Sequence, residues 1–127
     1  TAAKLRILVF DSNGEEPYRG KFIIFNGRKL AGIPANTGVL SAWQEHVIDL
    51  PPEHLAQLTI RNEIELTNPV GDYFKGTGLA LAVRLTDGSW VESKANDQTY
   101  SSVADWEYAE GTPFVGQRSA KIVLGFD

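Results

Sequence analysis

The sequence predicts an all-β domain, a two-sheet antiparallel β-sandwich with at most one or two short helical turns. Three observations indicate this fold. Eight or nine short apolar or alternating segments follow one another, turn-forming residues separate most of them, and no long amphipathic helical pattern occurs. A chain of 127 residues suits one domain, so we expect residues 1–127 to form a single sandwich, excised from a larger protein.

The first half of the chain contains four predicted strands. Lys4–Phe10 is an apolar, β-branched run that ends at turn-forming residues. Asn26-Gly27 lies between Phe22–Phe25 and Leu30–Ile33, and this dipeptide favours a two-residue hairpin turn because both positions tolerate positive φ. Gln44–Leu50 alternates loosely and ends at two prolines, which predicts a fourth strand.

The second half is also mostly strand. Pro51–Leu58 has proline and an acid near its start, so it predicts one or two helical turns. Glu63–Thr67 alternates polar and apolar residues, as a half-buried antiparallel strand does. Leu79–Leu85, Ser89–Ser93 and Ser119–Phe126 complete the strands. The segments that remain, 67–78 and 94–116, are predicted to be long loops, which in compact domains are often functional.

Composition limits the function classes. The net charge of −4 disfavours binding to a nucleic-acid backbone, which depends on clustered lysine and arginine. No apolar run approaches the ~20 residues of a membrane span. The chain has no cysteine, which excludes disulfides, thiolate metal sites and cysteine nucleophiles.

Catalytic motifs are weak, and we do not expect an enzyme. His46 with Asp49, and Glu53 with His54, are the local histidine–carboxylate groupings, but neither has a metal-binding helical spacing. We expect these four residues to be exposed at strand edges. No Gly-x-Ser-x-Gly nucleophile motif occurs in the sequence.

Several short motifs carry a family resemblance. The residues Phe25-Asn26-Gly27-Arg28-Lys29-Leu30, Val47-Ile48-Asp49-Leu50-Pro51, Leu55 and Asn62-Glu63-Ile64-Glu65-Leu66 follow one another in this order. This pattern resembles the jelly-roll domain of the galactose-binding-like superfamily, which includes carbohydrate-binding modules and sugar-binding domains of glycoside hydrolases. The resemblance covers about a third of the chain. An immunoglobulin-like or fibronectin-like sandwich is the alternative.

The resemblance implies a jelly-roll sandwich and a non-catalytic carbohydrate-binding module. Its partner would be a glycan or polysaccharide, and the parent chain would carry a catalytic domain. We expect an extracellular or periplasmic location. The alternative function is a structural or protein-interaction sandwich that is accessory to an enzyme or a surface assembly.

A calcium site is one further expectation. Asp11, Asn13 and Glu15 offer closely spaced oxygen ligands with a glycine for the bend, although the full EF-hand pattern is absent and an ordinary Asx turn explains the spacing equally. The resemblance implies a structural calcium ion that joins an early loop to the end of the last strand, where Asp127 lies. Binding itself requires no cofactor.

The predicted glycan contacts are mostly in the second half. Sugar recognition needs aromatic faces for the C–H surfaces of the ring, and polar side chains that bond its desolvated hydroxyl groups. Both types occur between residues 94 and 114. For Trp43 and Trp90, packing is favoured over binding, whereas for Trp106 and Tyr108 the two are balanced. The candidate ligand-binding residues are Trp106, Tyr108, Tyr100, Asn96, Asp97, Gln98, Arg84 and Trp43.

Overall fold

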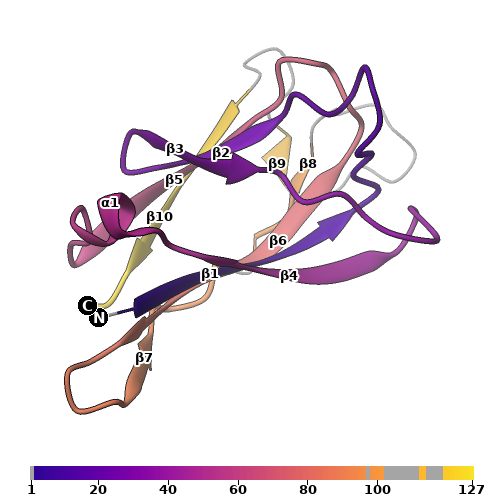
Figure 1. Ribbon diagram of the computed structural model, residues 1–127. Coiled ribbons are helices and arrows are strands. Elements are labelled where there is room, and N and C mark those ends of the chain that lie inside the picture. Colours follow the sequence, from indigo (N-terminus) through magenta and orange to yellow (C-terminus); the bar gives the residue numbers. More distant parts are fainter. Residues whose placement is uncertain (1, 97, 102–111, 114–118) are drawn as a thin grey trace.

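The computed structural model confirms the two-sheet β-sandwich (Figure 1). It describes residues 2–96, 98–101, 112–113 and 119–127. We call the two layers the large sheet and the small sheet. The large sheet has the order β4 (Trp43–Asp49), β1 (Ala2–Phe10), β6 (Lys75–Arg84), β8 (Tyr100–Ser101) and β9 (Thr112–Pro113), and β7 (Trp90–Glu92) also pairs with β6. The small sheet has the order β10 (Ser119–Gly125), β5 (Arg61–Thr67), β2 (Phe22–Phe25) and β3 (Arg28–Gly32).

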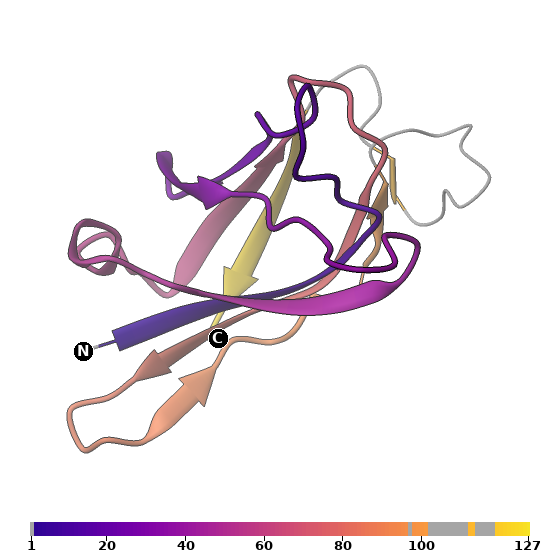
Figure 2. The same cartoon turned by 45° about the vertical axis from the view of Figure 1, so that its right-hand side comes forward.

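The chain crosses repeatedly from one sheet to the other, so strands that are neighbours in the sequence are often in different layers. Paired strands are antiparallel except for β8 and β9, which are parallel. Both termini lie at one end of the sandwich, and the loop that follows β1 lies at the other (Figures 1 and 2). We call this second end the loop end. Within the described residues, no helix has the length and apolar character needed to cross a bilayer.

The core lies between the two sheets and follows the period of two that strands impose. On β1, every second side chain points inward and is fully buried. Opposite strands contribute in the same way, and a buried side chain of this size contributes about 1.5–3 kcal/mol. The core includes Leu5, Ile7, Val9, Phe74, Leu79, Leu81, Ile23, Phe25, Ile64, Leu66, Ile122 and Leu124.

The Asn26-Gly27 hairpin is confirmed, with φ angles of 48° and 83°. The Asn26 side chain also stabilises the fold, because its Nδ2 donates to the carbonyl of Gln57 at 3.0 Å and to Asn62 Oδ1 at 3.0 Å. These bonds tie the hairpin to the segment that follows α1 (Pro52–Leu55), the short helix predicted from the two prolines. The turn is therefore specified by its own two residues and is also held by hydrogen bonds to residues distant in the sequence.

The expectation that His54 is an exposed strand-edge residue is wrong. His54 lies in α1 and is buried, with its Nε2 at 3.1 Å from the carbonyl oxygen of Lys29 and its ring edge-on to Phe25. The imidazole packs α1 against the β2–β3 hairpin. Its role here is structural.

The long loops are shorter than predicted. Residues 75–78 belong to β6, although two glycines made them resemble a loop. Gly76 packs closely, since an added Cβ would lie 3.4 Å from Ile7 Cδ1. Gly78 has φ 63° at an irregularity in the β1–β6 register, which is the kind of position where a bulge favours glycine.

The strand predicted over Ser89–Ser93 is confirmed as β7, and the start of the predicted 94–116 loop also follows the large sheet in residues 94–96 and 98–101. The chain runs along one edge of β6 through β7, Ser93, the isolated bridge of Asn96 with Leu79, and β8. The Ser93 hydroxyl accepts a hydrogen bond from the Leu81 amide at 2.9 Å, which satisfies that donor where the strand is interrupted. This segment is an interrupted strand of the large sheet.

Candidate ligand-binding site

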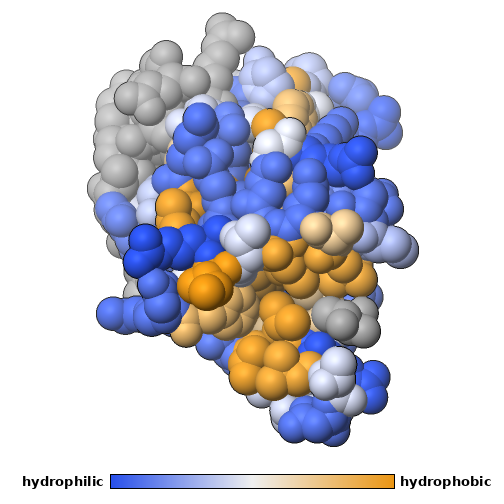
Figure 3. All heavy atoms as spheres, turned by 90° about the vertical axis from the view of Figure 1, so that its left-hand side faces the viewer, coloured by the Kyte–Doolittle hydropathy of each residue, from blue (hydrophilic) through white to orange (hydrophobic). Residues whose placement is uncertain are grey.

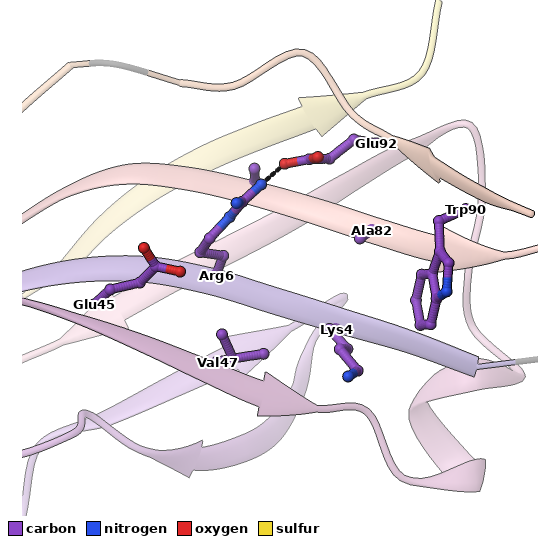
Figure 4. A pocket seen from close by; sticks show the side chains of 8 residues that line it. Lys4, Arg6, Glu45, Val47, Ala82, Trp90 and Glu92 are labelled. Carbon is purple, nitrogen blue, oxygen red and sulfur yellow. Dashed lines mark ion pairs between the residues drawn. The ribbon is translucent and has the colours of Figure 1, made fainter.

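The outer face of the large sheet carries a shallow groove of about 370 Å³, which we call the sheet groove (Figure 4). Four strands contribute to it: β1, β4, β6 and β7. Its lining combines an indole, charged groups and small apolar side chains. The lining residues are Lys4, Arg6, Glu45, Val47, Ala80, Ala82, Trp90 and Glu92.

Strand alternation explains why these side chains face outward. Because Leu5 and Ile7 point into the core, Lys4 and Arg6 point to the opposite face of β1. The antiparallel register places Ala82 beside Lys4 and Ala80 beside Arg6. These two alanines are short, so β6 forms a low floor between the longer side chains of its neighbours.

The charged groups of the groove interact across this floor. Arg6 on β1 and Glu92 on β7 form an ion pair that passes over β6 (Figure 4). The Lys4 ammonium lies 5.5 Å from the centroid of the Trp90 ring, a cation–π distance. The lining holds two cations, Lys4 and Arg6, and two carboxylates, Glu45 and Glu92, so its formal charge is zero.

Two tryptophans, Trp43 and Trp90, lie on this outer face. The prediction that Trp90 packs in the core is wrong. Trp90 is 46% exposed and forms one wall of the sheet groove. Trp43 is 39% exposed and lies outside the groove lining, near the loop end. Its ring packs 5.4 Å from that of Phe10, and the Lys75 ammonium lies over both rings at 5.6 and 4.5 Å. Trp43 is thus partly a packing residue and partly a surface residue.

Three of the predicted ligand-binding residues, Tyr100, Asn96 and Gln98, form hydrogen bonds with one another. Tyr100 is buried, and its hydroxyl accepts a hydrogen bond from Asn96 Nδ2 at 3.1 Å and donates one to Gln98 Oε1 at 3.3 Å. The Gln98 carbonyl accepts a hydrogen bond from Thr77 on β6. The structure therefore brings Tyr100, Asn96 and Gln98 together as an anchor of the interrupted strand, and the ring of Tyr100 offers no exposed face.

The other predicted contacts are separate from this anchor. Arg84 is exposed at the end of β6, opposite Trp90 in the β6–β7 register but outside the sheet groove. Trp106, Tyr108 and Asp97 lie outside the described residues, so their roles stay predictions.

A second hollow, of about 390 Å³, lies at the loop end, and we call it the loop-end cavity. Beneath it, the buried Lys21 ammonium donates to the carbonyls of Asn13 at 2.6 Å and Tyr18 at 2.9 Å, and pairs with Asp72 Oδ2 at 3.0 Å. Burial, followed by the nearby Asp72 charge, raises the pKa of Asp11, while Lys75 acts in the opposite direction. The lining residues are Asp11, Asn13, Tyr18, Leu40, Gly71, Asp72 and Tyr73.

The four predicted calcium ligands are not all brought together. Asp11 and Asn13 line the loop-end cavity, and Asn13 Oδ1 accepts a hydrogen bond from the Glu15 amide at 2.9 Å, as in an Asx turn. Asp127 is the last residue of the chain and lies at the opposite end of the sandwich (Figure 1). Its carboxylate pairs with Arg61 at 2.7 Å. Among the described residues, no three His, Asp or Glu side chains group as a metal site would.

None of the eight residues that line the sheet groove is among the predicted ligand-binding residues, and Trp90 was expected to pack in the core. The alternation of Leu5 and Ile7 with Lys4 and Arg6 signals an outward charged face, and the alternation in β6 signals its alanine floor. Joining them requires the order β4-β1-β6 and the pairing of β7 with β6, which no local pattern specifies. No protein-family model, curated protein or solved structure matches this chain.

Proposed function

We propose that this chain is a non-catalytic carbohydrate-binding module that binds a glycan in the sheet groove. The observation that carries the proposal is the exposed indole of Trp90 beside Lys4, Arg6 and Glu92, above an alanine floor. An aromatic face suits the C–H surface of a pyranose, and the charged groups can donate to and accept from its hydroxyls. The groove supplies both within one open surface.

The charge of the groove favours a neutral glycan. Two cations and two carboxylates cancel, and Arg6 is already paired with Glu92. Lys4 lies against the Trp90 ring, so a sugar would stack on the indole only where Lys4 leaves its face uncovered or moves aside. Because the groove is shallow and hydroxyl groups must be stripped of water, we expect weak binding.

The remaining expectations extend the proposal. Trp106 and Tyr108 would add aromatic contacts to the glycan, and Trp43 would lengthen the surface toward the loop end. A catalytic domain in the parent chain and an extracellular or periplasmic location accord with the resemblance to galactose-binding-like jelly rolls. A structural calcium ion held by Asp11 and Asn13 is the alternative occupant of the loop-end cavity, and titration with calcium chloride distinguishes it from an organic ligand.

Glycan-array binding by the Trp90→Ala variant tests the proposal, with Trp43→Ala as the matched control. Both residues are exposed tryptophans on the same sheet face, but only Trp90 lines the groove. We expect Trp90→Ala to weaken binding about tenfold, the equivalent of ~1.4 kcal/mol, and Trp43→Ala to weaken it less. Equal binding by wild type and Trp90→Ala would refute the groove assignment. Trp106→Ala tests the predicted aromatic contact of the later segment.

One observation favours the alternative function, a protein-interaction domain. The end of the sandwich near α1 and the termini shows a hydrophobic area beside a hydrophilic one (Figure 3). Ile60, which precedes β5, and Leu85, which follows β6, are exposed apolar residues of segments at this end. Ile60→Lys would abolish association with a protein partner under this alternative and leave glycan binding unchanged under the first proposal.

A further inference from the structure

The loop-end cavity differs from the sheet groove in its charge. Its seven lining residues include two carboxylates, Asp11 and Asp72, and no lysine or arginine. The sheet groove has equal numbers of both signs. Two cavities of similar volume on one domain therefore favour ligands of different charge.

The buried lysine beneath the cavity neutralises only part of this charge. The Lys21 side chain is 1% exposed, and its ammonium is held by two carbonyls and Asp72, so it cannot turn toward a ligand. Asp72 Oδ2 also accepts a hydrogen bond from the Asn13 amide at 3.0 Å. The Asp72 carboxylate is thus paired with groups of the protein itself. Asp11 is therefore the cavity carboxylate that can pair with a charged ligand.

A second lysine near Asp11 is directed toward aromatic rings. Lys75 pairs with Phe10 across the β1–β6 register, and its ammonium lies over the rings of Phe10 and Trp43. Among the described residues, none forms an ion pair with Asp11, whose charge a bound cation would therefore balance.

The walls of the cavity add aromatic surface. Tyr18 and Tyr73 are 38% and 51% exposed and both line it, one from the loop after β1 and the other from the loop before β6. Aromatic faces attract organic cations and also accept the C–H face of a sugar ring. A bare metal ion would use neither ring.

We propose that the loop-end cavity is a second binding site, one that takes the protonated amine of an amino sugar. The ammonium group lies against Asp11, the Asn13 side chain bonds ring hydroxyls, and Tyr18 and Tyr73 contact the ring. This assignment rests on the proposed glycan-binding function. It adds a cationic sugar to the neutral glycan of the sheet groove.

Titration followed by NMR chemical shifts tests this site with four probes: glucosamine, N-acetylglucosamine, glucose and cadaverine, at a pH where the amines are protonated. We expect glucosamine to shift resonances of Asp11, Tyr18 and Tyr73. N-acetylglucosamine and glucose, which lack the charge, should bind there at least tenfold more weakly. Cadaverine carries the amine without the sugar, so binding equal to that of glucosamine would overturn the sugar part of the assignment.

Variants separate this site from the sheet groove. Asp11→Asn should weaken glucosamine binding at least tenfold, and asparagine suits the φ of 62° at this position. Tyr73→Leu removes one ring and should also weaken binding. The control Asp87→Asn removes an exposed carboxylate from the β6–β7 turn and should change nothing.

The two proposals fail in different ways. Glucosamine shifts that are unchanged in Asp11→Asn, or equal affinity for glucosamine and N-acetylglucosamine, would overturn the amine site while groove binding persisted. Conversely, if the wild type bound no glycan on the array but still bound glucosamine at the loop end, the proposal of glycan binding in the sheet groove would be refuted. Calcium chloride that shifts the Asp11 resonances when glucosamine does not would assign the cavity to a metal and overturn the amine proposal.

Discussion

Replacing Lys21 with methionine should destabilise the protein by about 3–5 kcal/mol, the cost of removing one partner from a buried ion pair. The methionine keeps most of the apolar stem but loses bonds to two carbonyls and Asp72. Asp72 is only 6% exposed, so its carboxylate would remain buried without its cation. With a total stability of ~5–15 kcal/mol for a domain, this single change removes a large share.

Urea unfolding measures the effect, and the chain offers a matched control. Arg61 and Asp127 form an ion pair of 2.7 Å, close to the 3.0 Å of Lys21 and Asp72, but with side chains 71% and 50% exposed. With a slope of ~2 kcal/mol per M, Lys21→Met should lower the urea midpoint by roughly 2 M. Arg61→Met should leave it almost unchanged, because solvent screens exposed pairs.

A second variant separates the lost charge from lost packing. Lys21→Met combined with Asp72→Asn leaves no buried charge, so the double variant should be more stable than Lys21→Met alone. A loss below about 1 kcal/mol in Lys21→Met, or the same midpoint in Lys21→Met and Arg61→Met, would refute the reasoning that burial gives this pair its strength.

Two further outcomes concern one buried and one partly buried polar group. Asn62→Ala should cost about 1–3 kcal/mol in urea unfolding, because the buried carboxamide accepts from Asn26 and from the Thr59 amide and donates to the Thr59 carbonyl; an unchanged midpoint would contradict this. Asp11 should titrate above its ordinary pKa of 3.8 by NMR, and Asp72→Asn should bring its pKa closer to that value. Since the folded state holds this proton more tightly than the unfolded chain, the Asp11 contribution favours folding at acid pH and is lost as pH rises from 3.8 through the raised pKa of the folded state. An Asp11 pKa at or below 3.8 would contradict the burial argument.

The fold could be predicted because its signals are local. Asn26 and Gly27 adopt the positive φ angles that their residue types favour, so the hairpin needs no distant information. The alternation in β1 and β5 identifies the buried face of each strand directly. Such patterns follow from steric limits and from the period of two.

The functional surfaces could not be predicted in the same way, because they depend on contacts between distant residues. Lysine is usually exposed, so the sequence does not indicate that Lys21 is buried. Its partner Asp72 comes near only when the chain folds. Gly76 and Gly78 resemble loop residues, yet close packing with β1 places them in β6. Tyr100 is in a polar stretch, and its burial depends on pairing with β6.

The alternation of β6 also separates two kinds of genetic variation. Leu79 and Leu81 are in the core, whereas Ala80 and Ala82 form the floor of the sheet groove. Under the proposed function, a codon change at the partly exposed Ala82 would alter the groove before the interior, while a change at either leucine would affect folding first. Neighbouring positions of one strand would then evolve under different selection.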